Sequence, residues 1–496
     1  MENFKLGQII LGKNDGRNEA KIKEFENLFY DLDNIYEKVT DPFNFLVLGR
    51  KGTGKTLLAE LIKKRNNTQN SICNIVNYNK FNLTYFKELK SETDMKADEY
   101  LAVWEWVILI ELSKIVVRDL NSLKNSTLKK LSNFLEQNGF GLELDSYKTI
   151  EITKKNQIDG NFNIKIAKFG ENDEIIEKQV ITTFIECLEP LKEILCKLFK
   201  ENFKKEIILI YDELDTKFTN DVDYKNLIIS LIKKTGELNE FFYDKNIKIK
   251  IMVFLREDIF NLLNDYDLNK IKEDNSVKID WGRNEESSPL VEMIMKKIKH
   301  SYPSLSKKTT EEIIKLIFPK IKYNYYNNGN KSIKYINAFE YYLRRTFLRP
   351  RDLITFLNKI IDINKNADKF YDNLVKKAEK SYSEYLVNEI RNEMKGHLED
   401  EEIDYILSLL RTFSKRYFFY SDLENFYKTT KKENIEIDLK KCITLLFNLS
   451  VLGNHYIDNK RGVKFYKYNY REQNIEINFD QTFVLHEGFT KYFILK

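Results

Sequence analysis

One segment of the chain combines glycines, a lysine and a threonine at a spacing suited to binding phosphate. Gly49 is followed after four residues by Gly54, Lys55 and Thr56. Glycines let backbone N–H groups converge on phosphate oxygens, and a helix that starts here adds its dipole. We expect Lys55 to reach the β- and γ-phosphates and the Thr56 hydroxyl to bind Mg²⁺. The nucleotide-binding residues predicted from this loop are Gly49, Arg50, Lys51, Gly52, Thr53, Gly54, Lys55, Thr56 and Leu57.

Two adjacent acids end a later apolar run. Ile207–Tyr211 is continuously apolar and leads into Asp212 and Glu213. A phosphate-binding loop needs a carboxylate from a neighbouring strand to organise its metal, so Asp212 is predicted to hold Mg²⁺. Glu213 is predicted to be catalytic by polarising the attacking water, which suits hydrolysis better than simple binding. The alternative is an acidic turn after a strand, which is common in α/β proteins.

An arginine ends a third apolar run. Ile249–Leu255 leads into Arg256, Glu257 and Asp258. The carboxyl ends of parallel strands share one edge of a sheet, where ligands bind. Arg256 is therefore a candidate catalytic residue that senses the γ-phosphate. The alternative is an ordinary arginine that pairs with Glu257 or Asp258, or is solvated.

These residues need a scaffold that brings distant segments together. The run Phe43–Leu48 before the glycine-rich loop is a third candidate for a buried parallel strand, and a helical pattern follows the loop. The sequence thus predicts an α/β fold with a parallel sheet flanked by helices. A helical insertion at about residues 80–200 separates the loop from Asp212. Within it, Val103–Val117 is apolar but short and carries charges, which favours a core helix over a membrane span.

The composition narrows the class of protein. Only 6 prolines and 17 glycines in 496 residues favour a mostly helical chain. The 81 basic and 76 acidic residues give a net charge of only +5, which is too small to indicate nucleic-acid binding by itself. The four cysteines form no C-x-x-C pair, so no zinc site or disulfide framework is predicted. No signal peptide is recognised at the N-terminus, and a cytoplasmic protein without membrane contact is expected.

Four segments together resemble a known family. "VLGRKGTGKT", "IILIYDELD", "MVFLREDIF" and "FLRPRDLITFLN" follow one another in this order. The chain is similar, from roughly Leu6 to its C-terminus, to bacterial P-loop ATPases related to STAND, KAP and origin-recognition AAA+ NTPases. The resemblance implies ATP and Mg²⁺ as ligands and ATP hydrolysis as the activity. Several relatives act against phage, which implies the ATPase component of an antiviral defence system.

The same resemblance implies a helical lid after the sheet. In such ATPases the second arginine of an Arg-Pro-Arg segment approaches the nucleotide, and here this catalytic residue is Arg351. Pro350 suits the first helical turn, so Arg351 is expected near a helix N-terminus. Arg349 is expected to support it. Arg344 and Arg345 stay open between surface charge and contact with another subunit, and a protein partner or a homo-oligomer is expected.

The C-terminal part is predicted to be a winged helix. Three helical patterns, at about Glu401–Phe413, Tyr420–Tyr427 and Leu439–Leu449, precede a hairpin that turns at Asp458–Gly462. The basic wing is a candidate contact for a nucleic-acid backbone, and the alternative is packing within the chain or on a protein. Its basic residues are Lys460, Arg461, Lys464, Lys467 and Arg471, and the first three are the candidate contacts. The expected domains are 1–265 for the core, 266–395 for the lid and 396–496 for the winged helix.

Three functions follow from these patterns. The first is a molecular switch driven by ATP binding and hydrolysis. The second is an ATPase that depends on nucleic acid bound by the winged helix. The third is a partner-binding scaffold with a degenerate site. The complete set of polar site residues favours the first.

Overall fold

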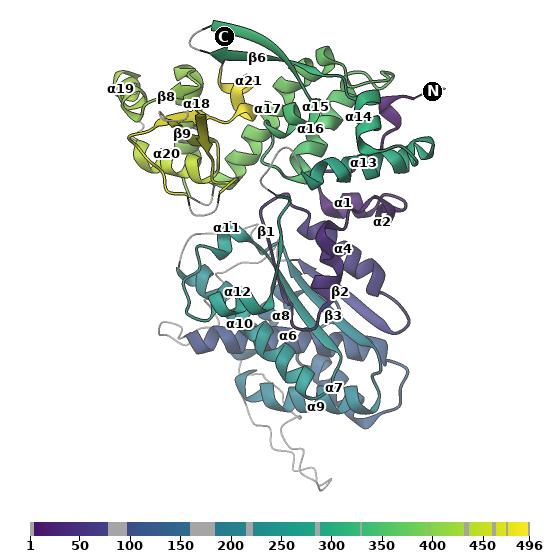
Figure 1. Cartoon of the computed structure of the whole chain (residues 1–496). Coiled ribbons are helices and arrows are strands. Elements are labelled where there is room, and N and C mark those ends of the chain that lie inside the picture. The colour runs from purple at the N-terminus through teal and green to yellow at the C-terminus, as the bar shows by residue number, and fades with distance from the viewer. Residues whose placement is uncertain are drawn as a thin grey trace. The chain divides into compact units, whose positions relative to one another are not determined.

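The computed structural model describes the chain as two compact units (Figure 1). The described residues are 4–77, 97–158, 184–214, 222–282, 288–327, 330–395, 397–430, 436–458, 463–472 and 475–494. The sheet unit comprises Asn34–Lys51 and Lys55–Ile279. The helical unit comprises Met1–Asp33, Gly52–Gly54 and Asp280–Lys496, so the middle of the glycine-rich loop groups with it.

The sheet unit is built on five parallel strands in the order β2-β3-β4-β1-β5. The strands are β1 (Leu46–Gly49), β2 (Ser71–Asn77), β3 (Glu206–Asp212), β4 (Ile249–Arg256) and β5 (Ser276–Ile279). The predicted runs before the loop, before Asp212 and before Arg256 are β1, β3 and β4. The expected parallel sheet is therefore confirmed. It continues past residue 265, where the sequence placed the end of the core, because β5 pairs with β1.

Helices cover both faces of this sheet. Ile207, Leu209 and Tyr211 of β3 belong to one hydrophobic core together with α6 and α10. Ile208 and Ile210, which point to the opposite face, are also buried, and α4 contacts β3. Burial on both faces explains why the strands read as continuous apolar runs rather than as alternating ones.

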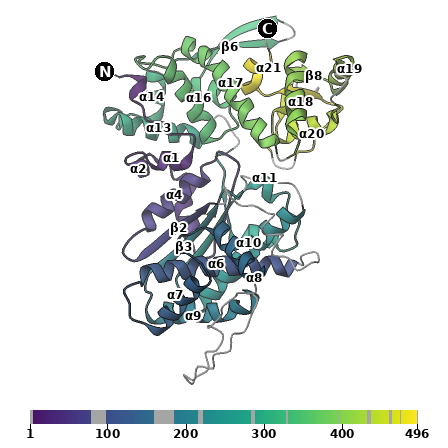
Figure 2. The same ribbon diagram turned by 180° about the vertical axis from the view of Figure 1, so that it is seen from behind.

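The insertion between β2 and β3 is helical where it is described. The helices of the sheet unit are α3 (Ile35–Thr40), α4 (Lys55–Asn66), α6 (Ala97–Asp119), α7 (Ser126–Gln137), α8 (Ser146–Ile158), α9 (Leu188–Glu201), α10 (Val222–Asp244), α11 (Glu257–Phe260) and α12 (Leu268–Asn275). In both views α7 and α9 lie beyond α6, on the side away from the sheet (Figures 1 and 2).

The charges within the apolar segment of α6 are paired inside the protein. Glu105 binds Lys192 at 2.8 Å and Lys234 at 3.0 Å. Burial raises the pKa of Glu105, but the two lysines outweigh it and hold the pKa below its usual value. The expected core helix is thus present. Across the part of the chain that the structure describes, we find no helix with the length and apolarity needed to cross a membrane.

The helical unit begins with short N-terminal helices and continues after β5. Its first part contains α1 (Gly16–Ala20), α2 (Phe25–Leu28), α13 (Pro289–Ser301), α14 (Thr310–Ile317), α15 (Ala338–Leu343), α16 (Pro350–Ile363), α17 (Asp372–Met394) and a hairpin of β6 (Ile321–Asn327) and β7 (Asn330–Ile336). The sequence predicted this part to be wholly helical, so the β6–β7 hairpin is a correction. Half of its strand residues are Tyr or Ile, which favour strands, but the Asn and Lys residues between them are poor strand indicators.

The C-terminal part contains α18 (Asp400–Phe413), α19 (Tyr420–Thr430), α20 (Leu439–Asn448), α21 (Thr490–Phe493), β8 (Tyr417–Phe418), β9 (Leu452–Asp458), β10 (Val463–Lys467) and β11 (Thr482–Leu485). It has the three helices and the hairpin that the sequence predicted, as α18, α19, α20 and β9–β10, whereas β8, β11 and α21 were not predicted. The strands form an antiparallel sheet in the order β10-β9-β11-β8. Lys460 and Arg461 of the expected wing lie outside the described residues, and Lys464 lies in β10.

Candidate functional site

Three predicted site segments meet at the carboxyl edge of the sheet. β1 ends at Gly49, β3 at Asp212 and β4 at Arg256. The pairing register places Gly49 beside Arg256. The edge is set by parallel pairing, because each strand must deliver its last residue on the same side.

The glycine-rich loop connects β1 to the first residue of α4, Lys55. Gly52 has a φ of 82° and Gly54 a φ of 103°, which residues with a Cβ atom adopt only with strain. The Lys55 ammonium donates hydrogen bonds to the carbonyls of Gly49 at 2.7 Å and Arg50 at 3.1 Å. The loop thus winds around the lysine amine. Of the remaining predicted residues, Thr53 is buried, while Arg50, Lys51, Thr56 and Leu57 are half-buried.

A threonine and a carboxylate from distant segments share a hydrogen bond at this edge. The Thr56 hydroxyl donates to Oδ2 of Asp212 at 2.8 Å. The sequence expected Asp212 on a strand next to β1, whereas β4 lies between β1 and β3. The pair still forms because Thr56 lies in the first turn of α4, which contacts both β1 and β3.

The protonation of Asp212 is shifted by its surroundings. Burial raises the pKa of this carboxyl to about 6, although the hydrogen bond from Thr56 and the charge of Lys55 act to lower it. Moving a carboxylate out of water disfavours its charged form, and a nearby cation restores that form. A hydroxyl and a buried carboxylate at contact distance are the oxygen donors that Mg²⁺ prefers. The glycine conformations, Lys55 and this pair together fit a Mg²⁺-nucleotide.

Glu213 lies directly after β3 with an unusual backbone. Its φ is 62°, the left-handed region that residues other than glycine seldom adopt. Strained backbone of this kind clusters at functional sites, where the surrounding structure holds it in place. Its side chain is half-buried, one residue from the Thr56–Asp212 pair.

Arg256 is paired with a neighbouring acid. Its guanidinium contacts both carboxylate oxygens of Asp258, with Nε at 3.1 Å from Oδ1 and an ion pair of 2.5 Å to Oδ2. The side chain of Asp258 is 52% exposed, and although loss of hydration acts to raise its pKa, the charge and hydrogen bond of Arg256 and the charge of Lys55 hold the pKa below its usual value. The structure thus shows the alternative that the sequence left open, in which Arg256 pairs with Asp258. The sensing role of Arg256 stays a prediction.

Arg351 contacts the glycine-rich loop within the helical unit. It is the second residue of α16, and its backbone N–H donates to the Gly52 carbonyl at 3.4 Å. A Cβ atom on Gly52 would lie 3.2 Å from the Cβ of Arg351, so Gly52 lets the two segments approach closely. The guanidinium pairs with Glu389 of α17 at 3.3 Å.

The other arginines of this segment pair with acidic residues. Arg349 is buried and binds both oxygens of Asp352 at 2.9 Å, and its support of Arg351 stays a prediction. Arg345 is half-buried and pairs with Glu379 at 2.9 Å and with Glu487 at 3.2 Å, and its contact with another subunit stays a prediction. Arg344 is partly exposed and pairs with Glu340 at 2.7 Å.

Sequence reasoning missed Trp281, which also holds the loop. Its indole N–H donates to the Thr53 carbonyl at 2.9 Å, and its ring is buried. Trp281 follows β5, a strand that the sequence did not reveal, so nothing placed it near the loop. The tip of the loop is therefore bound at two consecutive carbonyls, Gly52 by Arg351 and Thr53 by Trp281.

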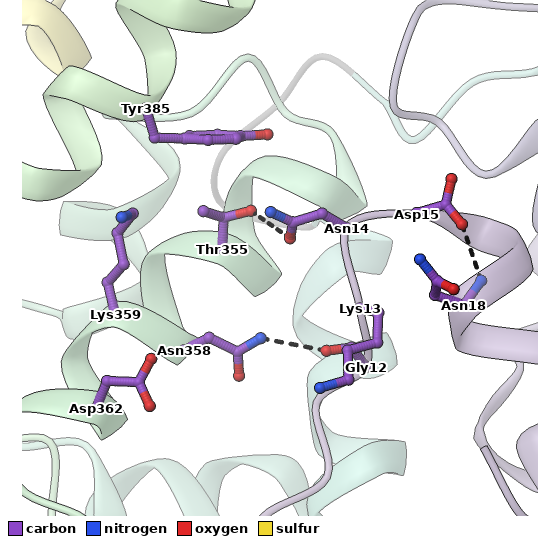
Figure 3. A pocket seen from close by; sticks show the side chains of 10 residues that line it. All are labelled: Gly12, Lys13, Asn14, Asp15, Asn18, Thr355, Asn358, Lys359, Asp362 and Tyr385. Atoms are coloured by element: carbon purple, nitrogen blue, oxygen red, sulfur yellow. Dashed lines mark hydrogen bonds between the residues drawn. The ribbon is translucent and has the colours of Figure 1, made fainter. Parts of the chain in front are cut away.

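A polar pocket of about 690 Å³ lies on α16, one turn beyond Arg351 (Figure 3). Its lining is Gly12, Lys13, Asn14, Asp15, Asn18, Thr355, Asn358, Lys359, Asp362 and Tyr385. Thr355 binds the side chain of Asn14 at 2.7 Å, and Asn358 binds the Gly12 carbonyl at 3.2 Å. The buried Tyr385 hydroxyl has no hydrogen-bond partner among the described residues. The sequence offered only a polar turn before α1 as a signal for this pocket.

The chain is thus an α/β protein with a five-stranded parallel sheet and a separate helical unit. Residues 288–391, from α13 through most of α17, match a family described as the FunZ-associated C-terminal helical domain. The matched segment carries Arg351 and the β6–β7 hairpin. No curated protein matches the chain.

Proposed function

We propose that this protein is a P-loop ATPase in which Mg²⁺-ATP binding and hydrolysis drive a switch. The observation that carries the proposal is the Thr56–Asp212 hydrogen bond of 2.8 Å, at the end of a loop with Gly-Lys-Thr at its helix start. A hydroxyl and a carboxylate in contact are the arrangement that holds Mg²⁺ beside phosphates in this class of site. The strand-end acid Glu213 supports hydrolysis over binding alone.

Each residue has a distinct part in the proposal. Lys55 exchanges its two loop carbonyls for β- and γ-phosphate oxygens. Thr56 and Asp212 hold Mg²⁺, which supplies positive charge to the phosphates when bound, and Glu213 orients the attacking water. Arg351 leaves Glu389 for the γ-phosphate, so that nucleotide state alters the contact between α16 and α17.

The proposal includes the finer identity of the domains. The residues 280–395 act as the lid, and the C-terminal elements are a winged helix. A role in antiphage defence follows from the family resemblance, with a separate protein as the damaging partner. Neither depends on the winged helix touching nucleic acid.

Removing the Lys55 amine is the direct test of nucleotide binding. We expect Lys55→Ala to weaken Mg²⁺-ATP binding by about 10- to 100-fold, because charged hydrogen bonds to phosphate contribute about 1.5–3 kcal/mol. Isothermal titration calorimetry with purified full-length protein measures it. Lys64→Ala, an exposed lysine on the same helix, should leave the affinity unchanged. Wild-type protein that binds no Mg²⁺-ATP at micromolar concentration contradicts the proposal.

A further inference from the structure

The β6–β7 hairpin presents an unusual face to solvent. Cross-strand partners share a face, and the register pairs Lys322 with Tyr335 and Asn324 with Ile333. Ile333 is 52% exposed and Tyr335 is 64% exposed. Lys322 and Asn324 are also exposed. An isoleucine and a tyrosine held this open do not contribute to the core, so folding does not explain them.

The opposite face of the hairpin is anchored. Ile321 is buried, and the Tyr323 hydroxyl donates to Glu487 at 2.8 Å. The Tyr323 ring also meets Tyr341 edge-on with centroids 6.3 Å apart. The ribbon is thus fixed to its unit by one face while the other stays open, and it lies along the outer edge of that unit in both views (Figures 1 and 2).

The charged side chains of the β6–β7 hairpin are all positive. Residues 319–337 contain lysines at 320, 322, 331 and 334 and no acidic residue. Lys320 and Lys322 are exposed, and Lys322 lies on the open face; Lys334 is also exposed but pairs with Tyr323 on the anchored face. The chain as a whole is nearly balanced, with 81 basic and 76 acidic residues, so this stretch departs from its own background.

We infer that the open face of the β6–β7 hairpin binds single-stranded nucleic acid. Lysines neutralise the phosphate backbone, while Tyr335 and Ile333 give a flat apolar surface on which unpaired bases stack. A protein partner would need a surface rich in acidic residues and poor in basic ones. Fewer molecules meet that requirement than the requirement for a phosphate backbone with unpaired nucleobases. A duplex hides its base faces and would leave Tyr335 and Ile333 in water. This inference is independent of ATP hydrolysis.

The test is binding of a fluorescent oligothymidine of about 20 nucleotides to the full chain, measured by anisotropy without nucleotide. We expect Tyr335→Ala and Lys322→Glu each to weaken binding about tenfold. Lys322→Ala should also reduce the slope of log K against log salt by about 0.7. Far-UV circular dichroism should be unchanged, because both side chains are exposed.

Matched controls separate this surface from general charge. Lys307→Glu makes the same charge change at an exposed site outside the hairpin, and Tyr266→Ala removes a fully exposed tyrosine from the sheet unit. Both should retain wild-type affinity. The inference would be overturned by no binding at low salt, by equal losses in the controls, or by tighter binding of a matched duplex. A Tyr335→Ala variant that loses self-association instead of oligonucleotide binding would also overturn it, in favour of a protein interface.

Discussion

Replacing Glu213 by glutamine is expected to slow ATP hydrolysis by about 10²- to 10⁴-fold while Mg²⁺-ATP binding stays nearly unchanged. Glutamine keeps the size and the hydrogen-bonding reach of the side chain but cannot accept a proton from water. The metal site is built from Thr56 and Asp212 and does not depend on this carboxylate. The loss should therefore appear in kcat and not in affinity, which steady-state phosphate release and calorimetry measure separately.

Glu257 offers a matched control for this experiment. Like Glu213, it is a glutamate that directly follows a strand of the parallel sheet, here β4. Its side chain is buried and pairs with Lys278 of β5. Glu257→Gln should leave kcat within about twofold, because its partner is a structural lysine at the sheet edge. If both variants hydrolyse ATP like wild type, Glu213 is not the catalytic base, and hydrolysis must be attributed elsewhere even if nucleotide binding is confirmed.

The sequence predicted those parts of the fold that have strong local patterns. β1, β3 and β4 are visible because strands buried on both faces are continuously apolar. β5 was missed because its four residues alternate between half-buried and buried, as an edge strand does. The β6–β7 hairpin was missed because Asn and Lys interrupt its Tyr and Ile residues, and because Ile333 and Tyr335 are exposed rather than part of a core.

The sequence predicted which residues belong to the candidate site, but not which side chains contact one another there. The motif spacing identified Lys55, Thr56 and Asp212, and the structure brings Thr56 and Asp212 together. Strand order could not be deduced, so the intervening β4 was not anticipated. The orientation of Arg256 depends on its rotamer, and the partner of Trp281 depends on where β5 leads, so neither could be read from spacing.

The segment Arg344–Arg351 also shows that the role of a residue depends on contacts that the sequence does not reveal. Its four arginines look alike in sequence, yet Arg349 is buried and Arg345 half-buried in ion pairs, while Arg351 contacts Gly52. The difference comes from α17 and the C-terminal residues, which supply Glu379, Glu389 and Glu487 from far along the chain. Charge pattern alone therefore cannot separate a structural arginine from a ligand-facing one.

The carboxylate of Glu487 contacts three parts of the helical unit. Among the charged residues of that unit, removing its charge is expected to lower the free energy of unfolding most. It pairs with Arg345 after α15 at 3.2 Å, with Arg416 before β8 at 3.0 Å, and accepts from Tyr323 of β6. Burial raises the pKa of Glu487, but the two arginines outweigh it and hold the pKa at about 2. Neutralising this carboxylate leaves two guanidinium groups without their main counter-charge.

Glu487→Gln is expected to lower the free energy of unfolding by about 3 kcal/mol at neutral pH, the usual cost of breaking a buried ion pair. Since the folded pKa is depressed, the contribution is complete above about pH 4.5 and is lost as pH falls toward about 2. The gap between wild type and variant should therefore shrink as pH falls through that window. Urea unfolding followed by circular dichroism at several pH values measures both.

The exposed pair of Glu424 and Lys428 on α19 provides the comparison. Glu424→Gln should cost no more than about 0.5 kcal/mol, because solvent screens an exposed helical ion pair. Equal costs for the two variants would mean that Glu487 does not secure the hairpin and the arginine segment to the C-terminal elements. A large cost for Glu487→Gln alone, fading in acid, would show that one buried carboxylate holds together the segment that contacts Gly52, the open ribbon and the C-terminal sheet.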